Sequence, residues 1–250
     1  DSSMRERNDH SIDWASFHRV KREEKMEKQN LSEDLMFANF LGTLTEAEQK
    51  MVEQNSTIVE LEKHEQVYKE GQVSDRIYFV KRGRVKIVTN GEDDKEVLKS
   101  LVHEGELLGE GAIFGERLRA DTAVAMDEGV TLIEMRAPAA REILKTNPEF
   151  SFKVTAQIAQ KLRSAEKRLE ALTFKNSRTR IIEFLKDTAF RQGRKIGYET
   201  LLHPFLTHQD IGNLTTTSRQ TVSSVLNELK GSNKIYYDRH RLLIRDLSVL

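Results

Sequence analysis

The sequence contains no cysteine, which excludes disulfides, thiolate metal ligands, iron–sulfur clusters and cysteine nucleophiles. It also has no apolar run near the roughly 18 residues that a membrane-spanning helix requires. Residues 1–30 are charged throughout and lack the apolar stretch of a secretory signal. From these absences we expect a cytoplasmic protein with no membrane partner.

The formal net charge of the whole chain is zero, but the charged residues are distributed unevenly along it. Residues 178–250 carry 12 Lys and Arg against 7 Asp and Glu, so residues 1–177 hold the balancing negative charge. A basic carboxy-terminal part predicts contact with an anion. The content of 38% hydrophobic and 32% charged residues is typical of globular proteins, and 250 residues are enough for two or more domains.

Short β-rich runs separated by glycines fill residues 55–136. Ile77–Val80 and Val85–Val88 flank a Lys-Arg-Gly turn and therefore predict a hairpin. Strands at this spacing favour an antiparallel barrel or jelly roll, which we assign to residues 31–147. Residues 1–30 are assigned to a charged amino-terminal extension.

A long helix is predicted for residues 148–176, which we interpret as a central dimerisation helix. Pro148 suits the first turn of a helix, and apolar residues then recur with spacings of 4, 3, 4 and 3, as in a coiled-coil seam. A helix packed on its own barrel would give the same pattern, so this alternative stays open. The predicted seam residues are Ile158, Leu162, Ala165, Leu169 and Leu172.

Residues 177–250 contain a pattern typical of a helix-turn-helix. Thr207 and Asp210 match a capping box that starts one helix, and Ser218 is a suitable N-cap for the next. Gly231 is placed to end this second helix.

The flanking segments complete the predicted architecture. Two short β runs about the basic turn 238–241 predict a wing, whereas the segment from about 194 to 205 is expected to be a loop. The fold class is therefore α+β: an antiparallel β jelly roll, a long dimerisation helix and a carboxy-terminal winged helix-turn-helix domain.

Polar side chains at the start of the second helix predict DNA readout, because this part of a helix-turn-helix lies along the major groove. A guanidinium there can donate two hydrogen bonds to guanine, and a glutamine can bind adenine in the same bidentate way. Nearby hydroxyl and imidazole groups would contact phosphates. The predicted DNA-binding residues are Arg219, Gln220, Ser223, Ser224, Thr207, His208, Ser218 and Thr221.

The same pattern allows other interpretations. A helix-turn-helix can be a plain αα-hairpin, or it can contact protein as part of a ligand-binding or docking module, whose affinity would depend little on salt. Catalysis is not expected, since GEGAIFGE (109–116) lacks the Lys-Ser/Thr of a phosphate-binding loop and no nucleophile has recognisable context. The seven histidines show no metal-binding spacing, so no metal site is predicted.

The chain resembles the CRP/FNR family of bacterial transcription regulators from about Leu31 to Leu250. GELLGEGAIFGERLRADTAVA (105–125) is similar to the family's phosphate-binding cassette, and LTHQDIGNLTTTSRQTVSSVL (206–226) is similar to its DNA-reading unit. The resemblance implies a parallel homodimer that binds a palindromic operator in double-stranded DNA, with RNA polymerase as a further partner. It also implies that the jelly roll, residues 31–147, is an effector or sensor domain that binds a small molecule. The central helix, residues 148–176, is implied to end at a hinge, which FKNSRTRI (174–181) resembles.

The family's effector site corresponds to several positions of this sequence. Glu110 and Arg119 fall where the family's cyclic-AMP binders hold the ribose and the cyclic phosphate, although Glu110 can instead be a buried carboxylate that accepts backbone N–H bonds. The hydroxyl residue that should follow the arginine is instead Ala120, with Asp121 beyond it, and a carboxylate beside a bound phosphate is repulsive. The candidate effector-binding residues are Leu108, Gly109, Glu110, Arg119, Ala120, Asp121, Thr122, Ala165 and Glu166.

This sequence differs from the family pattern at further positions. Ala165 and Glu166 replace the adjacent Thr and Ser that read adenine, so cyclic AMP is not favoured and another nucleotide or small molecule, or no effector, is expected. Gln220 and Ser224 replace a glutamate and a second arginine, so we expect a half-site that keeps one guanine. Thr216 stands where glycine is common, and we expect a differently built turn because β-branched residues disfavour positive φ.

Overall fold

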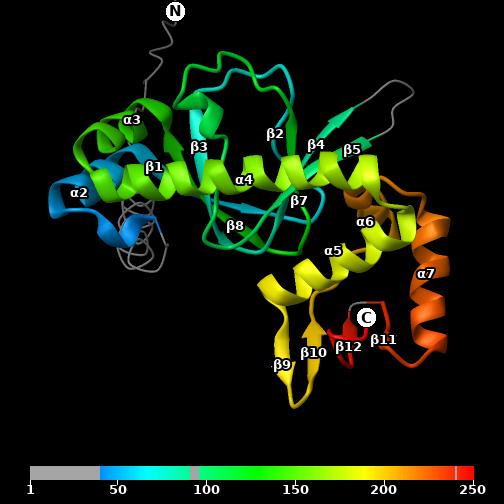
Figure 1. The fold of residues 1–250 in the computed structure, drawn as a ribbon. Helices are drawn as coiled ribbons and strands as arrows, with labels where there is room; N and C mark the ends of the chain where they lie inside the picture. Colours follow the sequence, from blue (N-terminus) through cyan, green and yellow to red (C-terminus); the bar gives the residue numbers. More distant parts are fainter. Residues whose placement is uncertain (1–39, 91–95, 240) are drawn as a thin grey trace, which may run out of the picture.

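The computed structural model describes residues 40–90, 96–239 and 241–250. The predicted extension, residues 1–30, lies outside the described residues. Two four-stranded antiparallel sheets form a β-sandwich in the first half of the chain, with strand orders β1-β8-β3-β6 and β2-β7-β4-β5 (Figure 1). Their strands are β1 (Ser56–Leu61), β2 (Gln66–Tyr68), β3 (Arg76–Arg82), β4 (Val85–Asn90), β5 (Glu96–Val102), β6 (Leu107–Leu108), β7 (Thr122–Ala125) and β8 (Val130–Arg136). The predicted antiparallel β domain is confirmed.

Strand β3 is buried on both faces, which explains its unbroken apolar run. Ile77 and Phe79 pack against helices α2 (Glu46–Asn55) and α3 (Ala137–Thr146) outside the first sheet. The alternate residues Tyr78 and Val80 pack between the two sheets. Because side chains alternate across a strand, the first sheet separates two apolar layers.

The predicted hairpin between residues 76 and 89 is wrong. Strand β3 pairs with β8 and β6, whereas β4 pairs with β5 and β7, so the turn carries the chain from one sheet to the other. Gly83 has a φ of 83° there, and a Cβ on it would lie 2.9 Å from Cγ2 of Val130. The same turn residues suit a hairpin and a crossing, and packing between the sheets decides which forms.

Helix α4 (Pro148–Phe174) runs along the sandwich and is followed by α5 (Ser177–Gln192) (Figure 1). Its start is fixed by Asn147, whose side chain accepts a hydrogen bond from the backbone N–H of Phe150. Only Phe150 and Val154 of this helix are fully buried. Most of α4 is therefore surface, apart from one side that touches the sandwich.

The carboxy-terminal domain combines α5, α6 (His208–Thr215) and α7 (Arg219–Gly231) with a four-stranded sheet of order β11-β12-β10-β9. Its strands are β9 (Arg194–Ile196), β10 (Glu199–Leu202), β11 (Ile235–Tyr237) and β12 (Leu242–Ile244). The predicted wing is present, but the expected loop at 194–205 contains a strand pair. The signal was missing because β9 is short, charged and exposed along its whole length.

The second sheet of the sandwich is apolar on its outer face because the carboxy-terminal domain covers it. Val88, Leu98 and Val124 share one apolar cluster with Ile211 and Leu214 of α6. This burial from both sides explains why every residue of β7 is buried. The two domains thus share a core.

Polar contacts surround this shared core. Arg84 donates a hydrogen bond to the carbonyl of Pro204 at 3.3 Å, and Nε2 of His103 lies 2.8 Å from the amide nitrogen of Gln192. Burial lowers the pKa of His103 from its ordinary value.

Among the described residues, none of the helices combines the length and the apolar character that a membrane span would need.

Candidate DNA-reading helix and effector cavity

The two helix starts in the helix-turn-helix have the predicted caps. Thr207 Oγ1 accepts a hydrogen bond from the backbone N–H of Asp210 at 3.1 Å, and Asp210 Oδ2 accepts one from the backbone N–H of Thr207 at 3.3 Å. Ser218 Oγ accepts from the backbone N–H of Thr221 at 3.0 Å. These bonds satisfy N–H groups that have no partner within the helix, and they define where α6 and α7 begin.

The turn between α6 and α7 is built on a left-handed residue after all. Thr216 has φ 52° and ψ 51°, so the expectation of a differently built turn is wrong. The chain passes close to Gly212, where a Cβ would lie 2.8 Å from the carbonyl oxygen of Thr217. Thr216 therefore retains the strain of a β-branched residue at positive φ, because the close approach at Gly212 determines the path of the backbone.

The end of α7 also differs from the prediction. Gly231 is its last helical residue, and the left-handed position falls two residues later at Asn233, with φ 57°. The N–H of Asn233 donates to the carbonyl of Lys230, and that of Lys234 to the carbonyl of Leu229. This is a Schellman motif, in which Asn takes the place usually held by Gly.

The first turn of α7 presents its polar side chains to solvent. Arg219, Gln220 and Ser224 are exposed, whereas Ser223 and Thr221 are partly buried. On the opposite side, Val222, Val225, Leu226 and Leu229 are buried against the rest of the domain. Helical periodicity thus separates a packing face from a face that is available to a ligand.

The remaining predicted DNA contacts lie beside this face. Ser218 is exposed at the N-cap of α7, and Thr207 is exposed at the N-cap of α6. His208 is half-buried, with its ring 5.7 Å from that of Tyr237 in the wing. Burial, followed by the charge of Arg219, lowers the pKa of His208, so the imidazole is neutral at pH 7.

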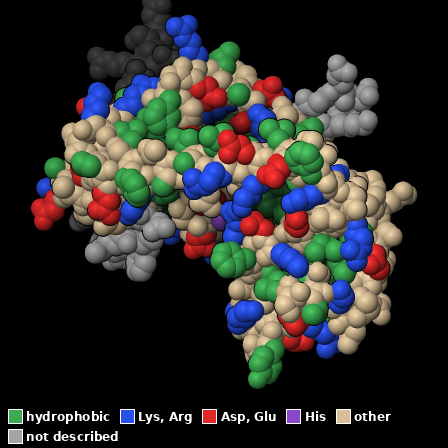
Figure 2. Space-filling view, in the orientation of Figure 1, with side chains coloured by type: hydrophobic (Ala, Val, Ile, Leu, Met, Phe, Trp, Pro, Cys, Tyr) green, Lys and Arg blue, Asp and Glu red, His purple; other side chains and the backbone are tan. Residues whose placement is uncertain are grey.

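The predicted seam on α4 is an exposed apolar stripe. Ile158, Leu162, Leu169 and Leu172 keep 36%, 59%, 67% and 41% of their surface exposed, and Ala165 is exposed too. Hydrophobic side chains recur between charged ones along the region of α4 in the space-filling view (Figure 2).

A different side of α4 holds the helix on the sandwich. The side-chain amide of Gln157 donates to the carbonyl of Leu107 at 2.7 Å, and its oxygen accepts from the N–H of that residue at 3.0 Å. Arg168 donates to the carbonyl of Lys99 at 2.8 Å. Packing on the chain's own barrel therefore involves these polar residues and leaves the apolar stripe uncovered.

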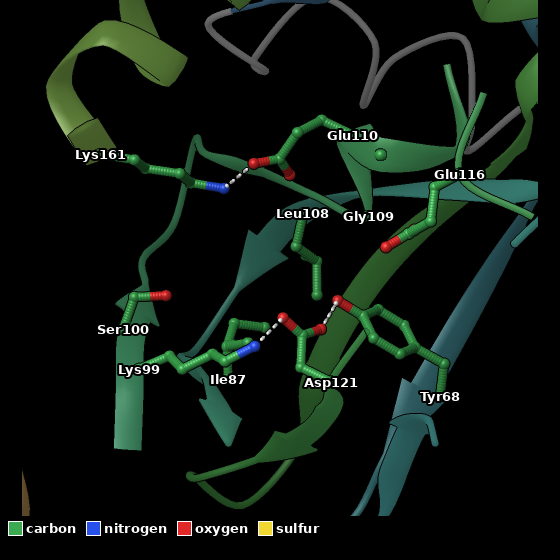
Figure 3. Close-up of a pocket in the computed structure, with 11 residues that line it drawn as sticks. Tyr68, Ile87, Lys99, Ser100, Leu108, Gly109, Glu110, Glu116, Asp121 and Lys161 are labelled. Atoms are coloured by element: carbon green, nitrogen blue, oxygen red, sulfur yellow. Dashed lines mark hydrogen bonds and ion pairs between the residues drawn. The ribbon is translucent and has the colours of Figure 1, made fainter. Parts of the chain in front are cut away.

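A cavity of about 330 Å³ opens between the sandwich and α4 (Figure 3). Lys161 of α4 reaches into it and pairs with Glu110 at 2.6 Å, while Lys99 pairs with Asp121 at 3.3 Å. The cavity is lined by Tyr68, Ile87, Lys99, Ser100, Leu108, Gly109, Glu110, Gly111, Glu116, Asp121 and Lys161. Its charged side chains largely neutralise one another, and no metal-binding cluster of His, Asp or Glu occurs among the described residues.

Arg119 does not line this cavity, contrary to its predicted role. The side chain is buried behind Tyr68, with its guanidinium carbon 4.2 Å from the centre of that ring. It donates hydrogen bonds to the carbonyls of Gly109 and Arg76, while its Nε has no hydrogen-bond partner among the residues that the structure describes. Burial raises the pKa of Tyr68, and that of Tyr78 to about 12, so both rings beside the guanidinium are neutral phenols.

The other predicted effector residues divide into two groups. Leu108, Gly109, Glu110 and Asp121 do line the cavity. Glu110 accepts from Lys161 rather than from the backbone bonds that its alternative role would need.

The rest of the predicted set lies elsewhere. Ala120 is exposed, and the hydroxyl of buried Thr122 accepts from the backbone N–H of Glu70. Ala165 and Glu166 are exposed on α4 outside the cavity lining. Sequence reasoning missed Lys161, although it is spaced by four residues from Gln157 and by seven from Arg168, so that the three lie on the side of α4 that contacts the sandwich.

A β-sandwich with a cavity beside its long helix, followed by a winged helix-turn-helix domain, defines a DNA-binding regulator of the kind that carries an effector domain. Residues 58–147 match the family model for the cyclic nucleotide-binding domain, and residues 179–250 match that for the Crp-like helix-turn-helix domain. The chain belongs to the CRP/FNR family of transcription regulators, a family whose members are not enzymes.

Individual relatives support the same assignment. The chain is 29% identical to the CRP-like cAMP-activated global transcriptional regulator of Mycobacterium tuberculosis over 180 residues, which are 72% of this chain and 80% of that protein. It is 25% identical to the cAMP-activated global transcriptional regulator CRP of Escherichia coli over 166 residues, 66% of this chain and 79% of that protein.

Solved structures show the same fold. A mutant of CooA from Carboxydothermus hydrogenoformans superposes with a TM-score of 0.68 at 24% identity, covering 78% of this chain and 86% of that one. FixK2 from Bradyrhizobium japonicum gives a TM-score of 0.68 at 18% identity, covering 78% of this chain and 94% of that one.

The strain at Thr216 predicts how substitutions in this turn change the free energy of unfolding. Thr216→Gly should raise the free energy of unfolding by about 0.5 to 1 kcal/mol, because relief of the left-handed strain exceeds the added chain entropy. Thr217→Gly, at the next residue, should instead lower it, since Thr217 lacks a positive φ and its hydroxyl bonds that of Thr215. Denaturant unfolding measures both variants, and equal effects would contradict the role of strain.

Proposed function

We propose that this regulator binds a palindromic operator as a homodimer and reads each half-site with the first turn of α7. The observation that carries the proposal is the exposed guanidinium of Arg219 at the start of a capped helix whose opposite face is buried. In this position a helix-turn-helix inserts its second helix into the major groove.

Arg219 would donate its two parallel hydrogen bonds to O6 and N7 of guanine. Gln220 would bind an adjacent adenine. Ser224, one helical turn later, provides no charged group that could contact a base. Thr207, Ser218 and Thr221 would contact phosphates, with His208 as a neutral donor. These contacts give a half-site with one guanine that is strongly required and a neighbouring position that tolerates A·T.

Replacing Arg219 tests direct readout. Arg219→Ala should lower the affinity for an operator with the required guanine by roughly 10-fold or more, while affinity for the same DNA lacking that guanine changes little. Arg194→Ala, which removes the same charge from exposed strand β9, should leave this contrast intact. Gel-shift titrations on the two DNA sequences give the contrast.

The salt dependence of the same titrations separates DNA binding from protein docking. Affinity for DNA should fall steeply with salt, because phosphate contacts release counterions. A guanine preference that survives in Arg219→Ala would show that another residue reads this base.

The exposed stripe on α4 is the proposed dimer interface. Leu162 and Leu169 expose more than half of their surface, and a second copy of the stripe would bury both. Two helices joined in parallel along this seam would place two α7 helices about 34 Å apart, one turn of DNA.

Charge introduced into the seam should separate the two chains. The double variant Leu162→Lys, Leu169→Lys is expected to sediment as a monomer and to lose at least 10-fold in operator affinity, because two desolvated cations would face their copies. Glu170→Lys, exposed beside the seam on the same helix, should remain a dimer. Single chains of the parent protein, both free and on the operator, would contradict the interface.

The cavity is proposed to bind an effector other than cyclic AMP. The carboxylate of Asp121 lines it, while the guanidinium of Arg119 is engaged with backbone carbonyls behind Tyr68. A phosphate would meet a carboxylate rather than a free cation. We further propose that the DNA-bound dimer acts on transcription through contact with RNA polymerase.

Calorimetric titration with cyclic AMP should therefore show no saturable binding at micromolar concentrations. The variant Asp121→Ala should gain affinity, because it removes the repulsive carboxylate and releases the ammonium of Lys99 from its ion pair. Asp127→Ala, outside the cavity lining, is the matched control and should behave like the parent. Tight binding by the parent that is lost in Arg119→Ala would overturn the proposal.

A further inference from the structure

Arg180 lies in the first turn of α5, and its guanidinium contacts the ends of two other helices. Its Nε donates to the carbonyl of Thr215 at 2.9 Å, and Nη2 donates to the carbonyl of Thr216 at 3.0 Å. Nη1 donates to the carbonyl of Lys175 at 2.7 Å. One planar group therefore joins the end of the central helix to the turn that precedes the recognition helix.

The three acceptors share a property that makes a guanidinium suitable. Lys175 is the C-cap of α4, Thr215 is the last residue of α6, and Thr216 is the C-cap of α6. Carbonyls at the end of a helix lack partners within the helix and carry the negative end of its dipole. Arginine offers five N–H donors in a rigid fork, whereas a lysine ammonium is a compact point charge.

The bond to Lys175 depends on the break between α4 and α5. In an uninterrupted helix the carbonyl of Lys175 would accept from the backbone N–H of Thr179. That N–H instead donates to Oδ1 of Asn176 at 2.9 Å, and Arg180 takes the vacated carbonyl. Asn176 and Arg180 together define the angle at which the two helices meet.

Arg178, two residues earlier, shows what a different arginine does on the same helix. It pairs with Glu228 of α7 at 2.7 Å, but both side chains are about half exposed. Exposed ion pairs contribute little to stability and are easily exchanged for water. Arg180 is partly buried and bonds to backbone atoms, so it constrains the positions of the helices themselves.

We propose that Arg180 is the positioning residue that sets the direction of the recognition helix relative to the central helix. Through Thr215 and Thr216 it fixes the turn just before α7, and through Lys175 it fixes that turn to the helix that carries the seam. The proposal rests on the proposed dimeric function for its consequence, which concerns the spacing of the two half-sites and not the bases read within each.

An intrachain distance tests the geometry directly. Because the chain has no cysteine, Lys167→Cys on α4 and Ser232→Cys after α7 place two spin labels without removal of native thiols. Labelled chains are mixed with excess unlabelled chains, so that electron double resonance reports distances within one chain. The parent should give a narrow distribution, and Arg180→Lys a clearly broader one. Arg191→Lys, an exposed position on the same helix paired with Asp187, should stay narrow.

A second variant separates positioning from simple stabilisation of the turn. Thr216→Gly relieves the strain that Arg180 helps to hold, so it should recover any melting temperature lost in Arg180→Lys. The distance distribution should stay broad in the double variant, because the bond to Lys175 is still missing. No broadening in Arg180→Lys, a return to narrow in the double variant, or failure of the double variant to fold would each overturn the proposal.

Operators with altered spacing give the functional readout. The parent should prefer one spacing between half-sites, and Arg180→Lys should lose about tenfold of that preference while the contrast at the guanine read by Arg219 is unchanged. An unchanged spacing preference would contradict the proposal. A parent without any spacing preference would contradict the dimeric operator instead, and the intrachain distance would still decide the role of Arg180.

Discussion

The central helix α4 contacts the sandwich with one side and leaves an apolar stripe exposed on another. The rest of the structure depends on this arrangement. Gln157, Lys161 and Arg168 fasten one side of α4 to the sandwich through backbone carbonyls and the Glu110 carboxylate. The apolar stripe lies on another side and remains exposed. Hydrogen bonds and ion pairs suit contact with strand edges that present unpaired carbonyls, whereas association with a second copy needs apolar area. The division therefore follows from the chemistry of the two surfaces.

The cavity sits at the junction of these two surfaces. Lys161 is both a cavity wall and one of the residues that fasten α4, so a ligand that engages Glu110 would compete with that attachment. A ligand changes the position of a helix only through its different affinity for the two arrangements. Here the competing group is an ammonium of the chain itself, which is why the binding of any effector would be coupled to the helix that carries the seam.

Local patterns were sufficient to predict the elements whose formation is decided within a few residues. The caps at Thr207 and Ser218 and the apolar repeat along α4 were predicted in this way. The errors concern choices made at longer range. The turn at Lys81–Gly83 suits either a hairpin or a crossing between sheets, and only the packing of Gly83 against Val130 distinguishes them. Strand β9 has no apolar alternation because pairing with β10, and not burial, makes it a strand.

The sequence by itself determined the fold class, the order of the elements and the polar first turn of α7, because these depend on residue types at fixed short spacings. The tertiary structure alone decided which charged groups meet in the cavity. Arg119 and Asp121 are two residues apart in the chain, yet one is buried behind Tyr68 and the other faces the cavity. It also decided that Arg180 bonds to the ends of two helices, since the three carbonyls come together only when the domain has packed. Contacts between distant segments depend on packing, which short spacings do not encode.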